Sequence, residues 1–150
     1  MVLNALDTYR DVGLLIVRMG LGISFMFAHG QGKLFAGPET WAQIGANAAN
    51  VGLDFFPVFW GFMAGLAEFG GGLLLLLGFL FRPALFLLIC TMITAAASHV
   101  AGTVPGGPLH AVEMGIVFLA LFFTGPGQYS LDAMLAPRDE VRAETPGSVS

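Results

Sequence analysis

The chain has 150 residues, of which 56% are hydrophobic and only 11% are charged. Soluble domains usually carry about 25% charged residues, so this composition predicts a protein surrounded by lipid rather than water. The net charge of −4 does not indicate a nucleic-acid-binding protein. Cys90 is the only cysteine, which excludes an intrachain disulfide and a Cys-x-x-Cys redox pair.

Apolar segments alternate with short polar loops along most of the chain. A membrane-spanning helix needs roughly 20 mostly apolar residues to cross about 30 Å of hydrocarbon. Four segments reach or approach that length, and the last of them is short: residues 12–30, 57–81, 83–101 and 110–124. The sequence therefore predicts an all-α integral membrane protein, a four-helix bundle.

Basic residues between the segments predict the orientation of this bundle. One side of the membrane collects Arg10, Arg82, Arg138 and Arg142, whereas the loops on the other side hold only Lys33. Basic residues accumulate on the cytoplasmic side of membrane proteins. We therefore expect an N-in/C-in, multi-pass protein of the inner membrane.

The composition of two segments outside the predicted spans also indicates their structure. Residues 40–51 are small and weakly apolar, and Trp41 suits a membrane interface, which predicts a short interfacial helix in the 31–56 loop. Residues 136–150 are polar and rich in Pro, Gly, Ser and Glu, which predicts a disordered cytoplasmic tail. Residues 1–135 would form one four-helix domain.

Ionisable residues interrupt the apolar segments, where each is costly unless paired and is by default a functional candidate. Arg18 and Glu68 both fall near the middle of their segments, so we expect a buried Arg18–Glu68 ion pair at the floor of a pocket. A pair that only fixes helix register is the simpler alternative. The remaining candidates gather toward the outside, with Lys33 as a substrate-binding residue beyond them: His29, His99, His110 and Glu113.

Glycines form a stripe on the second segment. Gly61, Gly65 and Gly72 share one helix face with Glu68. Small residues let membrane helices approach closely. The stripe therefore predicts close helix packing, either within the chain or in a homodimer.

An ordered series of motifs runs through the four segments and the residues that follow them. In chain order it reads Arg18, His29-Gly30-x-x-Lys33-Leu34, Ala67-Glu68-x-x-Gly71-Gly72, His99, Glu113 and Gly125-Pro126-Gly127-Gln128-Tyr129-Ser130-Leu131-Asp132. Over about residues 10–135 this series resembles the DoxX family of small bacterial and archaeal membrane proteins. The resemblance implies a four-helix bundle and a link to redox chemistry, because relatives include the membrane subunit of a thiosulfate:quinone oxidoreductase.

The first functional hypothesis is a membrane subunit of a redox system that binds or reduces a quinone. Electrons would come from a small reductant such as thiosulfate or from a partner protein. His99, Glu113 and His29 would be the catalytic residues that exchange protons with the quinone. The sequence holds no dinucleotide-binding, haem-attachment or iron–sulfur motif, so a flavin or nicotinamide cofactor would belong to a partner.

Two other hypotheses remain open at the level of sequence. A metal- or haem-binding membrane protein would use imidazole and carboxylate ligands from His29, His99, His110 and Glu113. A non-catalytic protein for assembly or transport would instead use the bundle as an anchor for membrane or periplasmic redox partners, with the glycine stripe serving a homodimer.

Overall fold

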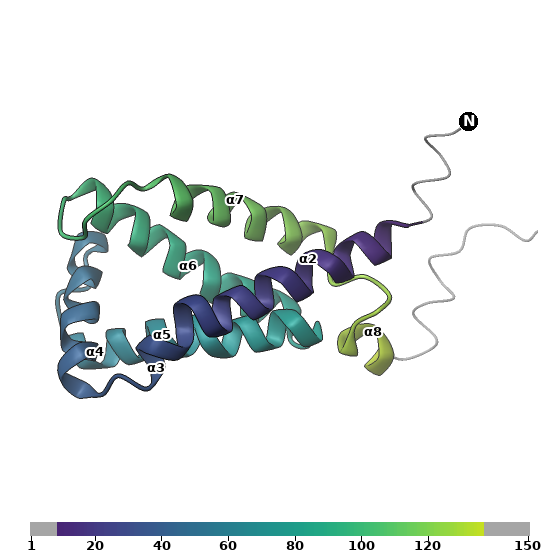
Figure 1. The fold of residues 1–150 in the computed structure, drawn as a ribbon, viewed down its shortest axis with the longest axis horizontal. Coiled ribbons are helices and arrows are strands. Elements are labelled where there is room, and N and C mark those ends of the chain that lie inside the picture. Colours follow the sequence, from purple (N-terminus) through teal and green to yellow (C-terminus); the bar gives the residue numbers. More distant parts are fainter. Residues whose placement is uncertain (1–8, 137–150) are drawn as a thin grey trace, which may run out of the picture.

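The computed structural model describes residues 9–136, and every regular element within them is a helix (Figure 1). Among the described residues, three stretches are long and apolar enough to cross a membrane: Arg10–Leu34, Pro57–Leu77 and Phe81–Val100. The fourth long helix, α7 (Leu109–Thr124), is apolar but shorter. The prediction of an all-α membrane bundle is confirmed, and the chain is a multi-pass membrane protein.

The first span is longer than the sequence predicts, and its helical geometry changes along its length. α2 (Arg10–Ser24) passes into a π-helix, η1 (Phe25–Gly30), and then into α3 (Gln31–Leu34). Wider π turns occur mostly as short insertions in α-helices and are frequent at functional sites. One result is that Lys33, expected in an outer loop, belongs to the helix.

The predicted interfacial helix is present as α4 (Pro38–Gly45) and the 3₁₀ segment η2 (Ala46–Val51). The two lie across one end of the bundle (Figure 1). Glycine permits this close packing, because a β-carbon on Gly45 would collide with the backbone of Pro57, and one on Gly61 with the backbone of Trp41. The α4–η2 segment therefore packs directly against the start of α5 (Pro57–Leu77).

A tight turn joins α5 to α6 (Phe81–Val100). Gly78 has a φ of 64°, and the amides of Gly78 and Phe79 donate to the carbonyls of Leu75 and Leu74. This is the Schellman pattern that ends helices at a left-handed glycine. It stops α5 at Leu77, before the predicted end at residue 81.

The opposite end of the bundle from α4 holds a short helix that the sequence did not predict, α8 (Leu131–Leu135). Its first turn is capped by Ser130, whose Oγ accepts a hydrogen bond from the amide of Ala133 at 3.2 Å. α2 begins and α8 lies at this same end (Figure 1), as an N-in/C-in arrangement requires. The predicted tail lies outside the described residues except for residue 136.

The two faces of α6 have different surroundings in the bundle. One face packs into the core through Phe81, Leu85 and Leu88, all of which are buried. Phe118 of α7 completes this core and meets Phe25 of η1 edge to face, with ring centroids 4.9 Å apart. The other face of α6 is rich in threonine and serine and lines a cavity.

Candidate functional site

Glu68 forms a buried ion pair with Lys33. The Nζ of Lys33 lies 2.7 Å from Oε1 of Glu68, with the Glu68 side chain only 3% exposed and the Lys33 side chain 36% exposed. Lys33 reaches this position because Gly30 lies directly against the backbone of Glu68 and Phe69. The pair therefore joins a buried carboxylate of α5 to the α3 end of the first span.

The predicted Arg18–Glu68 ion pair is wrong. Arg18 is 1% exposed and donates to four backbone carbonyls at 2.8–3.1 Å: those of Leu75, Leu76, Pro126 and Tyr129. The last carbonyls of a helix lack partners within the helix, and the rigid fork of a guanidinium can satisfy several at once. Arg18 thus caps the end of α5, away from Glu68.

The last part of the motif series lies at the same end of the bundle as Arg18 and helps to hold that end together. The Asp132 carboxylate accepts hydrogen bonds from the amides of Leu80 and Phe81 at 3.0 and 2.9 Å. Asp11 accepts from the amide of Gln128 at 3.0 Å. These contacts tie the α5–α6 turn, the start of α2 and the chain after α7 together. They fix the α8 end of the bundle and lie apart from the Lys33–Glu68 pair.

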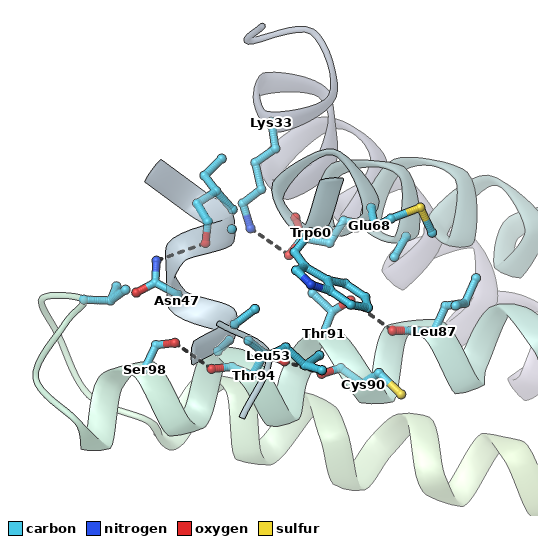
Figure 2. A pocket seen from close by; sticks show the side chains of 18 of the residues that line it. Lys33, Asn47, Leu53, Trp60, Glu68, Leu87, Cys90, Thr91, Thr94 and Ser98 are labelled. Carbon is cyan, nitrogen blue, oxygen red and sulfur yellow. Dashed lines mark hydrogen bonds and ion pairs between the residues drawn. The ribbon is translucent and has the colours of Figure 1, made fainter. Parts of the chain in front are cut away.

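A cavity of about 440 Å³ lies between α4, η2, α5 and α6, and Lys33 and Glu68 form part of its wall. From α5 it takes Trp60, Ala64 and Glu68, which recur every fourth residue on one helix face. Figure 2 shows the Lys33–Glu68 contact and the Trp60 ring in this wall. We call this space the α5–α6 cavity.

Two buried polar atoms in the wall of the α5–α6 cavity have no hydrogen-bond partner among the described residues. They are Oε2 of Glu68, an acceptor, and Nε1 of Trp60, a donor. Buried polar groups in folded proteins are nearly always hydrogen-bonded, and leaving one unpaired costs about 1–3 kcal/mol. An unpaired donor and an unpaired acceptor therefore belong to two residues that line the same cavity.

The α6 wall of the cavity carries three hydroxyl groups that are already used as donors. Thr91, Thr94 and Ser98 donate to the carbonyls of the residues four positions earlier, at 2.9, 3.1 and 2.7 Å. Leu87 and Cys90 on the same wall are exposed. This wall is therefore polar in patches and reaches the outer surface of the bundle, where lipid lies.

The end of the cavity near α4 is closed by a network of amide and hydroxyl groups. Asn50 of η2 donates to Oγ of Ser98 and to Oγ1 of Thr103 at 3.2 and 3.0 Å. His99 is half-buried in the same region, with its Nδ1 3.3 Å from the carbonyl of Val104. Of the three residues predicted as catalytic, only His99 lines the cavity.

The other outer candidates lie elsewhere. His29 and His110 stack on each other with ring centroids 5.6 Å apart, and His29 also contacts Phe25. Glu113 is exposed on α7. Within residues 9–136 no three His, Cys, Asp or Glu side chains are grouped as ligands for one metal ion. The four residues expected to gather are therefore split between the cavity, a histidine stack and the surface.

The predicted glycine stripe packs inside the chain. A β-carbon on Gly65 would lie 2.8 Å from the amide nitrogen of Leu34, and one on Gly72 would lie 2.9 Å from the carbonyl oxygen of Gly22. With Gly61 against Trp41, these glycines let α4, α3 and α2 approach α5 in turn. The stripe is therefore occupied by helices of the same chain.

Trp60 and the hydroxyl stripe of α6 line the cavity but are not among the site residues predicted from the sequence. Trp60 lies two helical turns before Glu68 on the same face, and Thr91, Thr94 and Ser98 follow the three- and four-residue spacing of one α6 face. Helical spacing therefore carries a signal for both, although neither residue type is ionisable in the usual range of pH.

Comparisons with known proteins agree with this architecture. The DoxX family model matches residues 13–101, which include Arg18, Lys33, Glu68 and His99. The inner membrane protein YqjF of Escherichia coli (strain K12) is 36% identical over 132 residues, covering 84% of this chain and 94% of that protein. No solved structure matches the chain. On the family match and this relative together, the chain belongs to the DoxX family.

Proposed function

We propose that this protein is a membrane subunit of a redox system in the inner membrane and that it binds a quinone in the α5–α6 cavity. The observation that carries the proposal is the pair of unpaired buried atoms, Glu68 Oε2 and Trp60 Nε1, in that cavity. The name of the similar inner membrane protein supports the proposed location. The redox role comes from the resemblance to a family with quinone-linked members.

The size and lining of the cavity suit a quinone ring. Small-molecule sites usually have volumes of about 300–1,000 Å³ and mostly apolar walls with a few placed polar groups, and this cavity has about 440 Å³. Met63, Ala64 and Ala67 supply apolar surface on α5. Because Leu87 and Cys90 are exposed, a ligand with an apolar tail could reach the cavity from the lipid.

The residues of the cavity can bind the ring and handle its protons. A quinone supplies an acceptor of two electrons and two protons, which convert it to a quinol. The Trp60 indole N–H can donate to a ring oxygen, and the Glu68 carboxylate can accept or return a proton at Oε2. Lys33 is partly exposed, and its ion pair with Glu68 links that carboxylate to the α4 end of the bundle.

The electrons must come from outside this chain. The sequence holds one cysteine and no motif for a bound redox cofactor. We therefore propose that a small reductant such as thiosulfate, or a membrane or periplasmic partner protein, reduces the quinone. The metal, haem and non-catalytic alternatives have no comparable observation in their favour.

The two tryptophans of the chain allow a direct test of quinone binding. Trp60 lines the cavity, whereas Trp41 packs against Phe62 outside it and donates to the carbonyl of Lys33. Quinones quench indole fluorescence at short range. In detergent-solubilised Trp41→Phe protein, a short-tailed ubiquinone analogue should quench most of the remaining emission and saturate near one molecule per chain.

The Trp60→Phe protein is the matched control, because its remaining tryptophan lies outside the cavity. Its emission should fall only weakly and in proportion to the quinone added, as expected for partition into the detergent. Equal, non-saturating quenching of both variants would show that the cavity does not bind the quinone and would refute the proposal.

A further inference from the structure

The hydrogen-bonding groups of the α5–α6 cavity are mostly acceptors. The hydroxyl groups of Thr91 and Thr94 already donate hydrogen bonds to backbone carbonyls, so their oxygens can only accept further hydrogen bonds. Oε2 of Glu68 is an unpaired acceptor as well. A ligand that satisfies this wall must bring donors of its own.

Several groups that line the cavity can donate, and most of them already have an acceptor. Asn47 donates to the carbonyl of Ile44 at 3.2 Å, and Nδ1 of His99 lies 3.3 Å from the carbonyl of Val104. Trp60 Nε1 is the unpaired one. Lys33 already donates one N–H to Glu68, and its side chain is the more exposed of the two. The free donor of the cavity, Nε1 of Trp60, can form a hydrogen bond with one ring oxygen of the ligand. A ligand that has no hydrogen-bond donor leaves Oε2 of Glu68 unpaired.

The ion pair decides which form of Glu68 the ligand meets. A contact of 2.7 Å between an ammonium and a carboxylate oxygen is a charge-assisted hydrogen bond that stabilises the ionised carboxylate. An ionised carboxylate accepts hydrogen bonds and donates none. A quinone offers only acceptors toward Oε2, whereas a quinol offers two O–H donors.

We infer that the α5–α6 cavity binds the reduced ligand, the quinol, more tightly than the quinone, with one quinol O–H donating to Oε2 of Glu68. This inference rests on the proposed quinone site and specifies its redox preference. A hydrogen bond to a charged acceptor is worth about tenfold or more in affinity. The preference expected is therefore at least about tenfold.

This preference has a consequence for electron transfer. Binding the reduced form more tightly raises the reduction potential of the bound couple, by about 30 mV for each tenfold in affinity for a two-electron couple. A bound quinone thus accepts electrons from the reductant more readily than a free one. The quinol product is then held more tightly than the quinone that it replaces.

Binding measurements on three proteins test the inference. We would titrate a short-tailed ubiquinone analogue and its chemically reduced quinol, without oxygen, into detergent-solubilised wild type, Glu68→Gln and Glu39→Gln, using calorimetry. Wild type should favour the quinol at least about tenfold. In Glu68→Gln the amide both donates and accepts, so the preference should fall to about twofold or less. Glu39 is exposed on α4 outside the cavity, so Glu39→Gln should match wild type.

A further variant separates the charge of Glu68 from its shape. Lys33→Met removes the ammonium that donates to Oε1 of Glu68, and with it the charge-assisted contact on which the preference for the quinol rests. The preference for the quinol should therefore be weaker than in wild type. All variants are first compared with wild type by gel filtration and helical circular dichroism, so that a misfolded protein is recognised.

The outcomes distinguish this inference from the proposed function. If neither form binds wild type, the proposed quinone site itself fails. If the quinone binds wild type as tightly as the quinol or more tightly, the site stands and the redox preference is refuted. The preference is also refuted if Glu68→Gln retains it in full.

Discussion

Arg18 and Glu68 are buried almost completely, with 1% and 2% of their surfaces exposed, yet they are stabilised in different ways. Glu68 has an ammonium partner, whereas Arg18 has backbone carbonyls. Two of these carbonyls end α5, where the helix dipole concentrates negative charge. A guanidinium placed there is held by carbonyls without a direct carboxylate partner, and Glu68 pairs with Lys33 instead.

Replacing Arg18 should destabilise the bundle more than removing one surface charge. Arg18→Met removes the donor to four carbonyls, of which only that of Leu75 keeps another donor among the described residues, the amide of Gly78, and we expect a loss of about 3 kcal/mol or more. Arg18→Lys should recover only part of this, because an ammonium lacks the planar fork. Thermal unfolding of the solubilised protein, followed by circular dichroism, measures both.

Arg82→Lys is the matched control for this experiment. Arg82 is exposed and makes only a 3.4 Å contact with the carbonyl of Phe122, so its replacement should change the stability by less than about 0.5 kcal/mol. Wild-type stability in Arg18→Lys would show that a single charge suffices and that the fork of hydrogen bonds is unimportant.

The wrong partner predicted for Arg18 shows which contacts of single residues a sequence leaves undetermined. That Arg18 and Glu68 are buried and need partners follows from their apolar surroundings. Which partner each takes depends on the offset between α2 and α5. Gly22 lies against Leu76, and Gly30 lies against Glu68, so Arg18 is about 18 Å along the helix from the level of Glu68.

At the scale of elements, the glycines of α5 differ in what surrounds them. A β-carbon on Gly61 would collide with the backbone of Trp41, which cannot move without shifting α4. A β-carbon on Gly70 would meet only Cδ1 of Leu66, at an ordinary 3.6 Å. The two positions are therefore a matched pair for testing how α4 is held.

We expect Gly61→Ala to destabilise the protein by about 1–3 kcal/mol, as overpacking of a close contact usually does. Gly70→Ala should be neutral or stabilise by up to about 1 kcal/mol, because alanine is the better helix former. Thermal unfolding compares the two. If Gly61→Ala were as stable as Gly70→Ala, α4 would not be held by this contact.

Helix ends that carry a local signal were predictable, whereas a change of helix type was not. Pro57 begins α5 as expected, and residues 83–101 were predicted where α6 covers Phe81–Val100. The π-helix η1 packs against α5, and no residue in it marks the change of helix type. That segment carries the helix on to Lys33, so the Lys33–Glu68 pair depends on a feature that the sequence does not signal.

At the scale of the whole molecule, the two ends of the bundle have different roles. One end is fixed by Arg18, Asp132 and Asp11, which join α2, the α5–α6 turn and the chain before α8. The other end is closed by α4 and η2, and the α5–α6 cavity lies beneath them. The side of the membrane on which the cavity lies therefore determines from which side a reductant or a partner can approach.

The distribution of basic residues predicts that α4 and the cavity lie on the outer side and α8 on the cytoplasmic side. In a Cys90→Ala background, Ala36→Cys and Met134→Cys place one exposed thiol at each end of the bundle. A membrane-impermeant maleimide added to intact spheroplasts should label Ala36→Cys at once and Met134→Cys only after lysis. The reverse pattern would place the cavity on the cytoplasmic side, and a periplasmic reductant or partner could then no longer be the electron source at this site.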